Sequence, residues 1–400
     1  MLQLRRVYHL LLASSLASIA ALPAGAQSTN VLAGCDMRSG KSSSQTSIND
    51  DDGVRRWRIS WSGDGCSIDM KAEGRFELER DLSDVKSMDR GAYLEIDVRS
   101  NGDRRRYEVS GTSSGLERRY AVNRTEQPID ADARRWIAAM LLELERRTAF
   151  AVHTRVPDLL RSGGPGAVMD EVAKMHSDYV QRRYLTVMLD SARLDGAQVS
   201  RAIRLSSDEL ASDYEQASFL VDLGKRGYVT TDVAGDFVKA TSSINSDYER
   251  RRALGTVLAL PNLPAATVAE LLQAASSFRS DYERAELLLT TAKANGFPNG
   301  AARDAYLGAA ASISSDYEKH RVLKRLARAE LTDDQLIALL STAKSIRSDY
   351  ELATLLLEVS EGRTLDGKAR DAYLEATETI GGDYERRRAL AALLSRRGSL

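Results

Sequence analysis

Apolar and polar residues alternate with a period of two in five short runs near the N-terminal end of the chain. The runs are residues 57–61, 68–70, 76–78, 93–98 and 107–109. Such alternation is typical of strands with one buried face, and Asn101-Gly102-Asp103 between the last two runs is a hairpin-turn signal. The pattern predicts a small antiparallel sheet with one face in water.

Residues 130–150 change to helical spacing, because Trp136, Ile137, Met140, Leu141 and Leu144 recur three or four positions apart. This spacing predicts one amphipathic helix that closes the sheet. Residues 38–53 are polar and without period, which predicts a flexible loop. We therefore expect a flexible segment over residues 27–54 and a β-rich domain over residues 55–152.

An Asp-Tyr pair recurs seven times beyond the helix breakers Gly163-Gly164-Pro165-Gly166, at intervals of 33 to 35 residues. A fixed interval in this range is the signature of stacked repeats. The seventh residue after each Asp is Leu, and the third and tenth residues before it are apolar or aromatic in every repeat. Each repeat therefore has two helices, each with one stripe to bury.

Five of the seven repeats carry Ser-Asp-Tyr-Glu. This motif predicts a capping box, in which Ser accepts from the Glu amide and the Glu side chain bonds back to the Ser amide. The Asp adds negative charge at the positive end of the helix dipole.

A single helix pair leaves its apolar stripes in water, so stability requires neighbouring repeats. The sequence predicts an all-α solenoid over residues 160–400, with about seven repeats of ~34 residues. With the sheet, the fold class is α+β. HEAT-like describes the array better than tetratricopeptide, because the Trp-x-x-Leu-Gly pattern is absent.

The repeated tyrosines lie away from the leucine stripe on a helical wheel. They are Tyr179, Tyr214, Tyr248, Tyr282, Tyr317, Tyr350 and Tyr384. Two interpretations stay open. Each ring packs on the adjacent repeat or the preceding helix end, with its hydroxyl bonded locally. Alternatively, the rings form a ladder spaced by roughly 8–10 Å, which binds an extended peptide or a partner helix.

Composition and charge exclude several classes of protein. The chain has 56 Lys+Arg against 57 Asp+Glu, so its net charge of -1 gives no general attraction to nucleic acid. Residues 1–26 combine Arg5 and Arg6, an apolar stretch over 10–22 and Ala24-Gly25-Ala26, the pattern of an export signal. The apolar stretch is short for a membrane span. We expect a periplasmic or secreted protein.

Cys35 and Cys66 are the two cysteines. In an oxidising compartment they are expected to form a disulfide. Alternatively, Leu32-Ala33-Gly34-Cys35 is similar to a lipobox, in which Cys35 would carry a lipid anchor. Polar residues 27–30 separate it from the apolar stretch and argue against that reading.

Motifs with catalytic associations are weak here. Ser341 and Lys344 match Ser-x-x-Lys without a Lys-Thr-Gly partner, and residues 111–115 match a nucleophile elbow but join two strands. His153, His176 and His320 lack metal-ligand spacing. The arginine clusters 104–106, 250–252 and 386–388 would suit an anionic partner, although interspersed acids favour salt-bridged surfaces. We predict no catalytic residues, cofactor or metal.

Three segments carry a family resemblance: residues 305–319 around Ser315-Asp316-Tyr317-Glu318, residues 115–120 and residues 132–136. They resemble the extracytoplasmic region of BlaR1-type (M56 family) membrane metallopeptidase homologues. His-Glu-x-x-His is absent, so the protease activity does not carry over. The resemblance implies a free-standing, sensor-like region.

The sequence thus favours an exported, non-enzymatic scaffold that binds a protein or peptide through the solenoid surface. The alternative, implied by the resemblance, is an extracytoplasmic sensor for a small cell-wall-related ligand.

Overall fold

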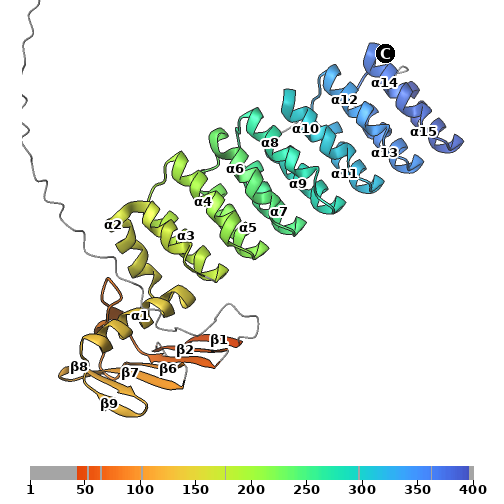
Figure 1. The fold of residues 1–400 in the computed structure, drawn as a ribbon. Coiled ribbons are helices and arrows are strands. Elements are labelled where there is room, and N and C mark those ends of the chain that lie inside the picture. Colours follow the sequence, from red (N-terminus) through yellow and green to blue (C-terminus); the bar gives the residue numbers. More distant parts are fainter. Residues whose placement is uncertain are drawn as a thin grey trace, which may run out of the picture. The chain divides into compact units, whose positions relative to one another are not determined.

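The computed structural model describes residues 43–51, 54–63, 65–100, 102–175, 177–295, 298–361 and 363–395. They divide into two compact parts, coloured along the chain in Figure 1. The sheet part runs to Arg75 and resumes over Asp89–Met140, and the helical part comprises Phe76–Met88 and the chain from Leu141. The predicted α+β fold class is confirmed.

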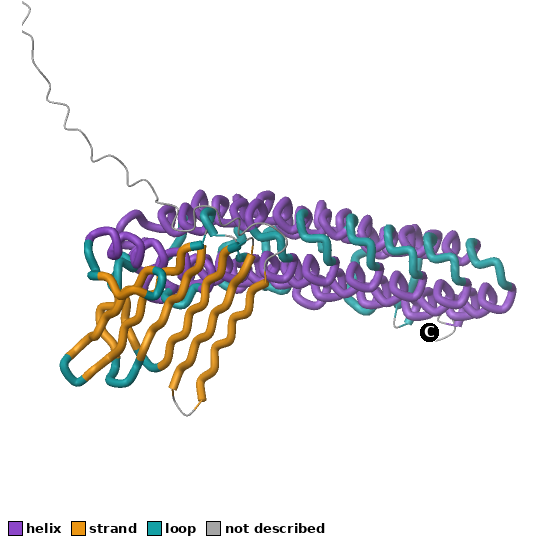
Figure 2. The backbone as a smooth tube through the Cα atoms, turned by 60° about the horizontal axis from the view of Figure 1, so that its bottom comes forward, coloured by secondary structure: helices purple, strands orange, loops and turns teal. Residues whose placement is uncertain are grey.

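The sheet part contains a seven-stranded antiparallel sheet. Its order is β1 (Ser43–Asp51), β2 (Val54–Gly63), β3 (Cys66–Glu73), β6 (Tyr93–Ser100), β7 (Asp103–Thr112), β8 (Gly115–Val122) and β9 (Thr125–Gln127). Figure 2 shows these strands side by side. Met70, Ile96 and Val109 are fully buried on one face, while most of the alternate positions are partly exposed. Helix α1 (Ala131–Thr148) packs on the apolar face, where the Trp136 and Tyr120 rings are 5.6 Å apart.

Two expectations about this region were wrong. Residues 43–51 were expected in a flexible loop but form β1, paired with β2 along its whole length. An edge strand pairs through its backbone, so a polar sequence does not prevent it. Residues 76–78 form β4 (Phe76–Leu78), which pairs only with β5 (Val85–Met88) and belongs to the helical part. The second half of α1, from Leu141, also belongs to the helical part.

The helical part stacks seven helix pairs within the described residues. They are α2 (Val152–Val172) with α3 (Asp178–Ser191), α4 (Gly196–Glu209) with α5 (Asp213–Lys225), α6 (Thr231–Ser242) with α7 (Asp247–Leu258), α8 (Ala265–Ala275) with α9 (Asp281–Asn295), α10 (Gly300–Ala311) with α11 (Asp316–Ala327), α12 (Asp333–Ala343) with α13 (Asp349–Ser360), and α14 (Gly367–Glu378) with α15 (Asp383–Ser395). Even-numbered helices form one layer and odd-numbered helices the other (Figure 1). None of the described helices is long and apolar enough to cross a membrane.

The predicted stripes form the core between repeats. The tenth residue before each repeat Asp is fully buried in all seven repeats, from Val168 to Tyr373. The leucine seven residues after the Asp is fully buried in six repeats, and Leu390 in the last repeat is half-buried. The glycine-proline breaker is a kink inside α2, where Gly164 has a left-handed φ of 64°. Stacking of neighbouring repeats is therefore the main source of burial.

In the first six repeats, the Asp accepts hydrogen bonds from the backbone of the following repeat. The Asp213 carboxylate accepts from the amides of Asn245 at 3.0 Å and Ser246 at 2.8 Å. Equivalent bonds are made by Asp178, Asp247, Asp281, Asp316 and Asp349. We call this contact the aspartate clasp. It joins residues 31 to 34 positions apart and ties successive odd-numbered helices at their N-terminal ends.

The clasp changes the predicted capping box. Ser246 accepts from the amide of Glu249 at 3.4 Å, and four other repeats repeat this bond, so the first arm of the box is confirmed. The Ser246 amide, however, donates to Asp213 of the preceding repeat. The acceptor for the Ser amide is therefore the Asp of the preceding repeat, and not the Glu of the same helix as predicted. The Glu carboxylate is instead available for ion pairs with arginine, as in Glu249 with Arg252.

A buried carboxyl lies at the first repeat. Glu145, in the last turn of α1, accepts from the Tyr184 hydroxyl and from the Ala151 amide, both at 2.6 Å. Burial raises its pKa from 4.5 to about 7, although both hydrogen bonds and the charges of Arg155 and Arg183 oppose the rise. The carboxyl thus favours its protonated form in the folded chain.

Asp213→Ala is expected to lower the free energy of unfolding by about 1–3 kcal/mol, because two amides of the next repeat lose a charged acceptor. Asp383 begins the last odd-numbered helix, and no described repeat follows it. Asp383→Ala should therefore cost less than about 1 kcal/mol, the helix-dipole contribution alone. Urea denaturation followed by helical circular dichroism measures both. Equal losses would contradict a role for the clasp.

Glu145 is expected to weaken the fold as the pH rises. Its contribution to stability is complete below the ordinary pKa of 4.5 and is lost as the pH passes through about 7. Glu145→Gln keeps a neutral group that can accept from Ala151 and donate to Tyr184. The melting temperature of wild type minus that of the variant, measured between about pH 5 and pH 8, should fall with pH. A constant difference would rule the effect out, since all other titrating groups cancel.

Candidate interaction surface

The seven repeated tyrosines lie on the surface. Each follows the clasp Asp in the first turn of an odd-numbered helix and keeps between 46% and 71% of its surface exposed. The other three positions that mark the repeat are buried, with the exception of half-buried Leu390, so the rings stand outside the core, as the helical wheel indicates. We call this row the tyrosine ladder. The exposed rings correspond to the second interpretation of the sequence, a row of tyrosines along one surface.

Guanidinium groups lie over several of the rings. Arg251 stands 5.2 Å from the centroid of Tyr248 in its own helix. Arg252 stands 5.3 Å from the ring of Tyr214 in the preceding repeat, and Arg388 lies in the same way over Tyr350 at 5.7 Å. A cation–π contact at an exposed site is favourable by about 0.5–1 kcal/mol, which favours one orientation of the ring and leaves the ring accessible. Tyr179, Tyr214, Tyr248, Tyr317 and Tyr350 have such a contact.

The acids beside the ladder already have partners. Glu249 pairs with Arg252 in its own helix, and Glu283 pairs with Arg251 of the preceding repeat. Arg279 donates to the carbonyl of Asn245 at 3.4 Å and has no ion pair within the described residues; Arg347 bonds in the same way two repeats further on. The groups that remain outward are mainly hydrogen-bond donors, the guanidinium N–H and the tyrosine O–H.

The arginine clusters separate into buried and surface roles. Arg250 is 7% exposed, and burial lowers its pKa. It donates to Ser277 at 2.5 Å at the end of the next even-numbered helix. Arg386 donates to the carbonyl of Ile380 at 2.9 Å. Arginines at the third position after the repeat Asp thus donate hydrogen bonds near the ends of even-numbered helices. Arginines one or two positions later lie over the rings of the ladder.

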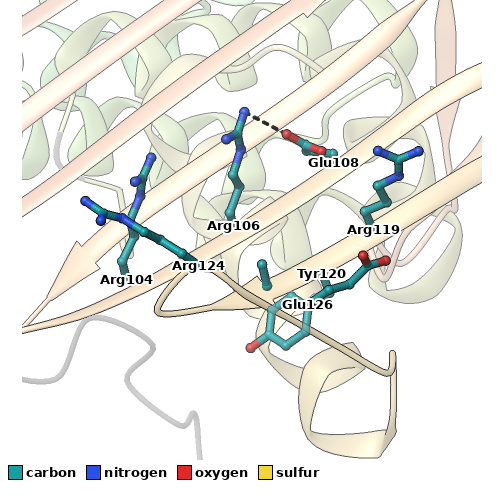
Figure 3. Close-up of a pocket in the computed structure, with 8 residues that line it drawn as sticks. Arg104, Arg106, Glu108, Arg119, Tyr120, Arg124 and Glu126 are labelled. Carbon is teal, nitrogen blue, oxygen red and sulfur yellow. Dashed lines mark ion pairs between the residues drawn. The ribbon is translucent and has the colours of Figure 1, made fainter.

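A cleft of about 290 Å³ lies on the outer face of the large sheet. Figure 3 shows its lining: Arg104, Arg106, Glu108, Arg119, Tyr120, Ala121, Arg124 and Glu126. Arg106 pairs with Glu108 at 2.7 Å, and Arg104 bonds to Asp97 at 2.9 Å, which raises the pKa of Arg104. Most of the positive charge of the cleft is therefore neutralised, as the acids interspersed among these arginines in the sequence indicated.

Among the described residues, the structure does not place the residues of the catalytic-looking motifs beside the groups that catalysis would need. Lys344 lies 3.0 Å from Glu375, so its ammonium is in an ion pair and Ser341 lacks a free base. Residues 111–115 form the turn between β7 and β8, where the Thr112 hydroxyl donates to the carbonyl of Gly115 at 2.8 Å. His320 contacts Glu351. Among the residues that the structure describes, no group of three or more His, Cys, Asp or Glu could hold a metal.

The predicted disulfide and export signal lie largely beyond the described residues. Residues 1–42, with Cys35 and the lipobox-like motif, fall outside them, as does His176. Cys66 is buried at the start of β3. The disulfide between Cys35 and Cys66 stays a prediction.

Comparison with protein-family models, curated proteins and solved structures finds no match to this chain. The resemblance to BlaR1-type homologues therefore stays an expectation.

Sequence reasoning found the ladder positions and the arginine clusters 250–252 and 386–388, but did not connect these arginines with the rings that they cover. Their signal was present: arginines occur four or five residues after the Asp in repeats such as the third, with Arg251 and Arg252. The sequence did not show that Arg252 contacts the tyrosine of the preceding repeat and not that of its own helix.

Tyr282→Ala is expected to change the free energy of unfolding by less than about 0.5 kcal/mol, because the ring is 53% exposed. Tyr306→Ala is the matched contrast. Its ring is fully buried and its hydroxyl donates to the Leu288 carbonyl at 3.1 Å, so the loss should be about 3–5 kcal/mol. Urea denaturation compares the two. Similar losses would show that Tyr282 has a structural role.

Proposed function

We propose that the protein is an exported, non-enzymatic scaffold that binds a protein or peptide partner along the tyrosine ladder. The observation that carries the proposal is the repeated exposure of one aromatic ring per repeat, in the same position of all seven odd-numbered helices. Export is supported by the signal pattern of residues 1–26.

The ladder is not needed to hold the array together. Cohesion between repeats comes mainly from the buried stripes and the aspartate clasps, because about half or more of each ring's surface stays exposed. Tyrosine and arginine are the residues most enriched at binding hot spots. A tyrosine ring also presents a large contact area with little loss of side-chain entropy. A row of both therefore favours macromolecular binding.

A small-ligand sensor has weaker support. The sheet cleft of about 290 Å³ is at the lower limit of small-molecule pockets, which run from about 300 to 1,000 Å³. Arg104, Arg106 and Arg119 already pair with neighbouring acids, so a ligand anion would have to displace those acids. The ladder is the better candidate surface.

The test is capture from an extract of exported proteins on the immobilised chain. One variant carries Tyr→Ala at Tyr214, Tyr248, Tyr282, Tyr317 and Tyr350. The matched control carries Ala at five exposed residues of the even-numbered helices: Lys239, Gln273, Asp304, Asp334 and Glu378. Wild type and control should retain the same partner, and the ladder variant should lose it by about tenfold or more.

Circular dichroism first checks that both variants fold. A partner retained equally by all three chains would place binding elsewhere. No specific partner on any of them would remove the proposal altogether.

A further inference from the structure

We infer that the tyrosine ladder binds a proline-rich segment in the polyproline II conformation. The inference rests on the proposed function and names the chemistry of its partner. It depends on three properties of the ladder: its spacing, its hydrogen-bonding groups and its unpaired charges.

The spacing expected between adjacent rungs matches one turn of polyproline II. Adjacent odd-numbered helices pack against each other, and each carries its tyrosine at the same position. Packed helices lie roughly 8–10 Å apart. Polyproline II has three residues per turn and about 3.1 Å per residue, so its equivalent side chains recur every ~9.3 Å. In a β-strand they recur at about 6.6–6.8 Å and lose register with the ladder.

The hydrogen-bonding groups of the ladder are complementary to a chain without N–H groups. The clasp carboxylates accept from backbone amides, and the Glu carboxylates beside the rings pair with arginines. Donors therefore prevail on this edge. Polyproline II makes no internal hydrogen bonds, so its carbonyls are free to accept, and proline brings no N–H that would need an acceptor. A β-strand would bring such donors, and an α-helix uses its own carbonyls.

The surface between the rungs also argues against a helical ligand. An amphipathic helix requires a continuous apolar groove. Here the charged side chains of Arg251 and Arg252 lie against the rings, so the apolar surface is interrupted. Proline rings dock instead on separate aromatic side chains, which is how proline-rich segments are recognised in other domains.

The unpaired charges add a sequence preference. Arg279 and Arg347 occupy equivalent positions two repeats apart and have no ion pair among the described residues. Two repeats correspond to two turns of polyproline II, or about six residues. The favoured segment therefore carries carboxylates about six residues apart among its prolines.

The test is fluorescence anisotropy with labelled peptides of about 18 residues, long enough for about six rungs. The first is proline-rich with Glu at every sixth position. Two controls keep the length and the Glu positions but replace proline by alanine, which favours helix, or by alternating Thr and Val, which favours strand. The proline peptide should bind the wild-type chain about tenfold or more tightly than either control.

The chain variants locate the site. The five-tyrosine ladder variant should weaken binding of the proline peptide by about tenfold or more, and the even-helix control variant should leave it unchanged. Arg279→Ala with Arg347→Ala should weaken the Glu-containing peptide several-fold, and leave a peptide with Gln in place of Glu unaffected.

Equal binding of the proline and alanine peptides, or binding that the ladder variant retains, overturns the inference. If a helical or strand peptide binds through the ladder instead, or if the ladder captures a partner without a proline-rich segment, the inference fails while the proposed function stands. If the ladder variant captures the same partners as wild type, both fail.

Discussion

The aspartate clasp is the interaction on which the repeat array depends. The first amides of a helix have no partner within that helix. In each following repeat, the turn before the odd-numbered helix offers such amides, and the Asp of the preceding repeat supplies a carboxylate that accepts from them, as Asp213 does for Asn245 and Ser246. Hydrogen bonds to a charged acceptor are stronger than neutral ones. The clasp thus sets the register of one repeat against the next in a way that apolar stripes alone do not.

The ladder inherits its order from the clasp. Tyr follows the clasp Asp directly in the first helical turn, so each bond that aligns two helices also aligns two rings. The clasp and the Glu–Arg pairs engage the acids on this edge, which leaves rings and donors facing outward. The same residues that stabilise the array therefore give the surface its chemical character.

The part of the fold that could be predicted is the part with local signals. Leucine seven residues after the Asp, and apolar residues three and ten before it, predicted a core that includes Leu220 and Phe237. The polar strand β1 was missed because its pairing with β2 depends on backbone groups and not on side-chain pattern. Glu145 was missed because a helical position shows nothing of the Tyr184 hydroxyl 39 residues away.

The sequence by itself determined the repeat length, the two helices of each repeat and the tyrosine positions, because periodicity within one helix is a local property. Only the tertiary structure decided that the Asp carboxylate serves the next repeat and not its own helix, and that Arg252 covers Tyr214 of the preceding one. The reason is physical. These partners are more than 30 residues apart in the chain, and only the stacking of repeats brings them within bonding distance.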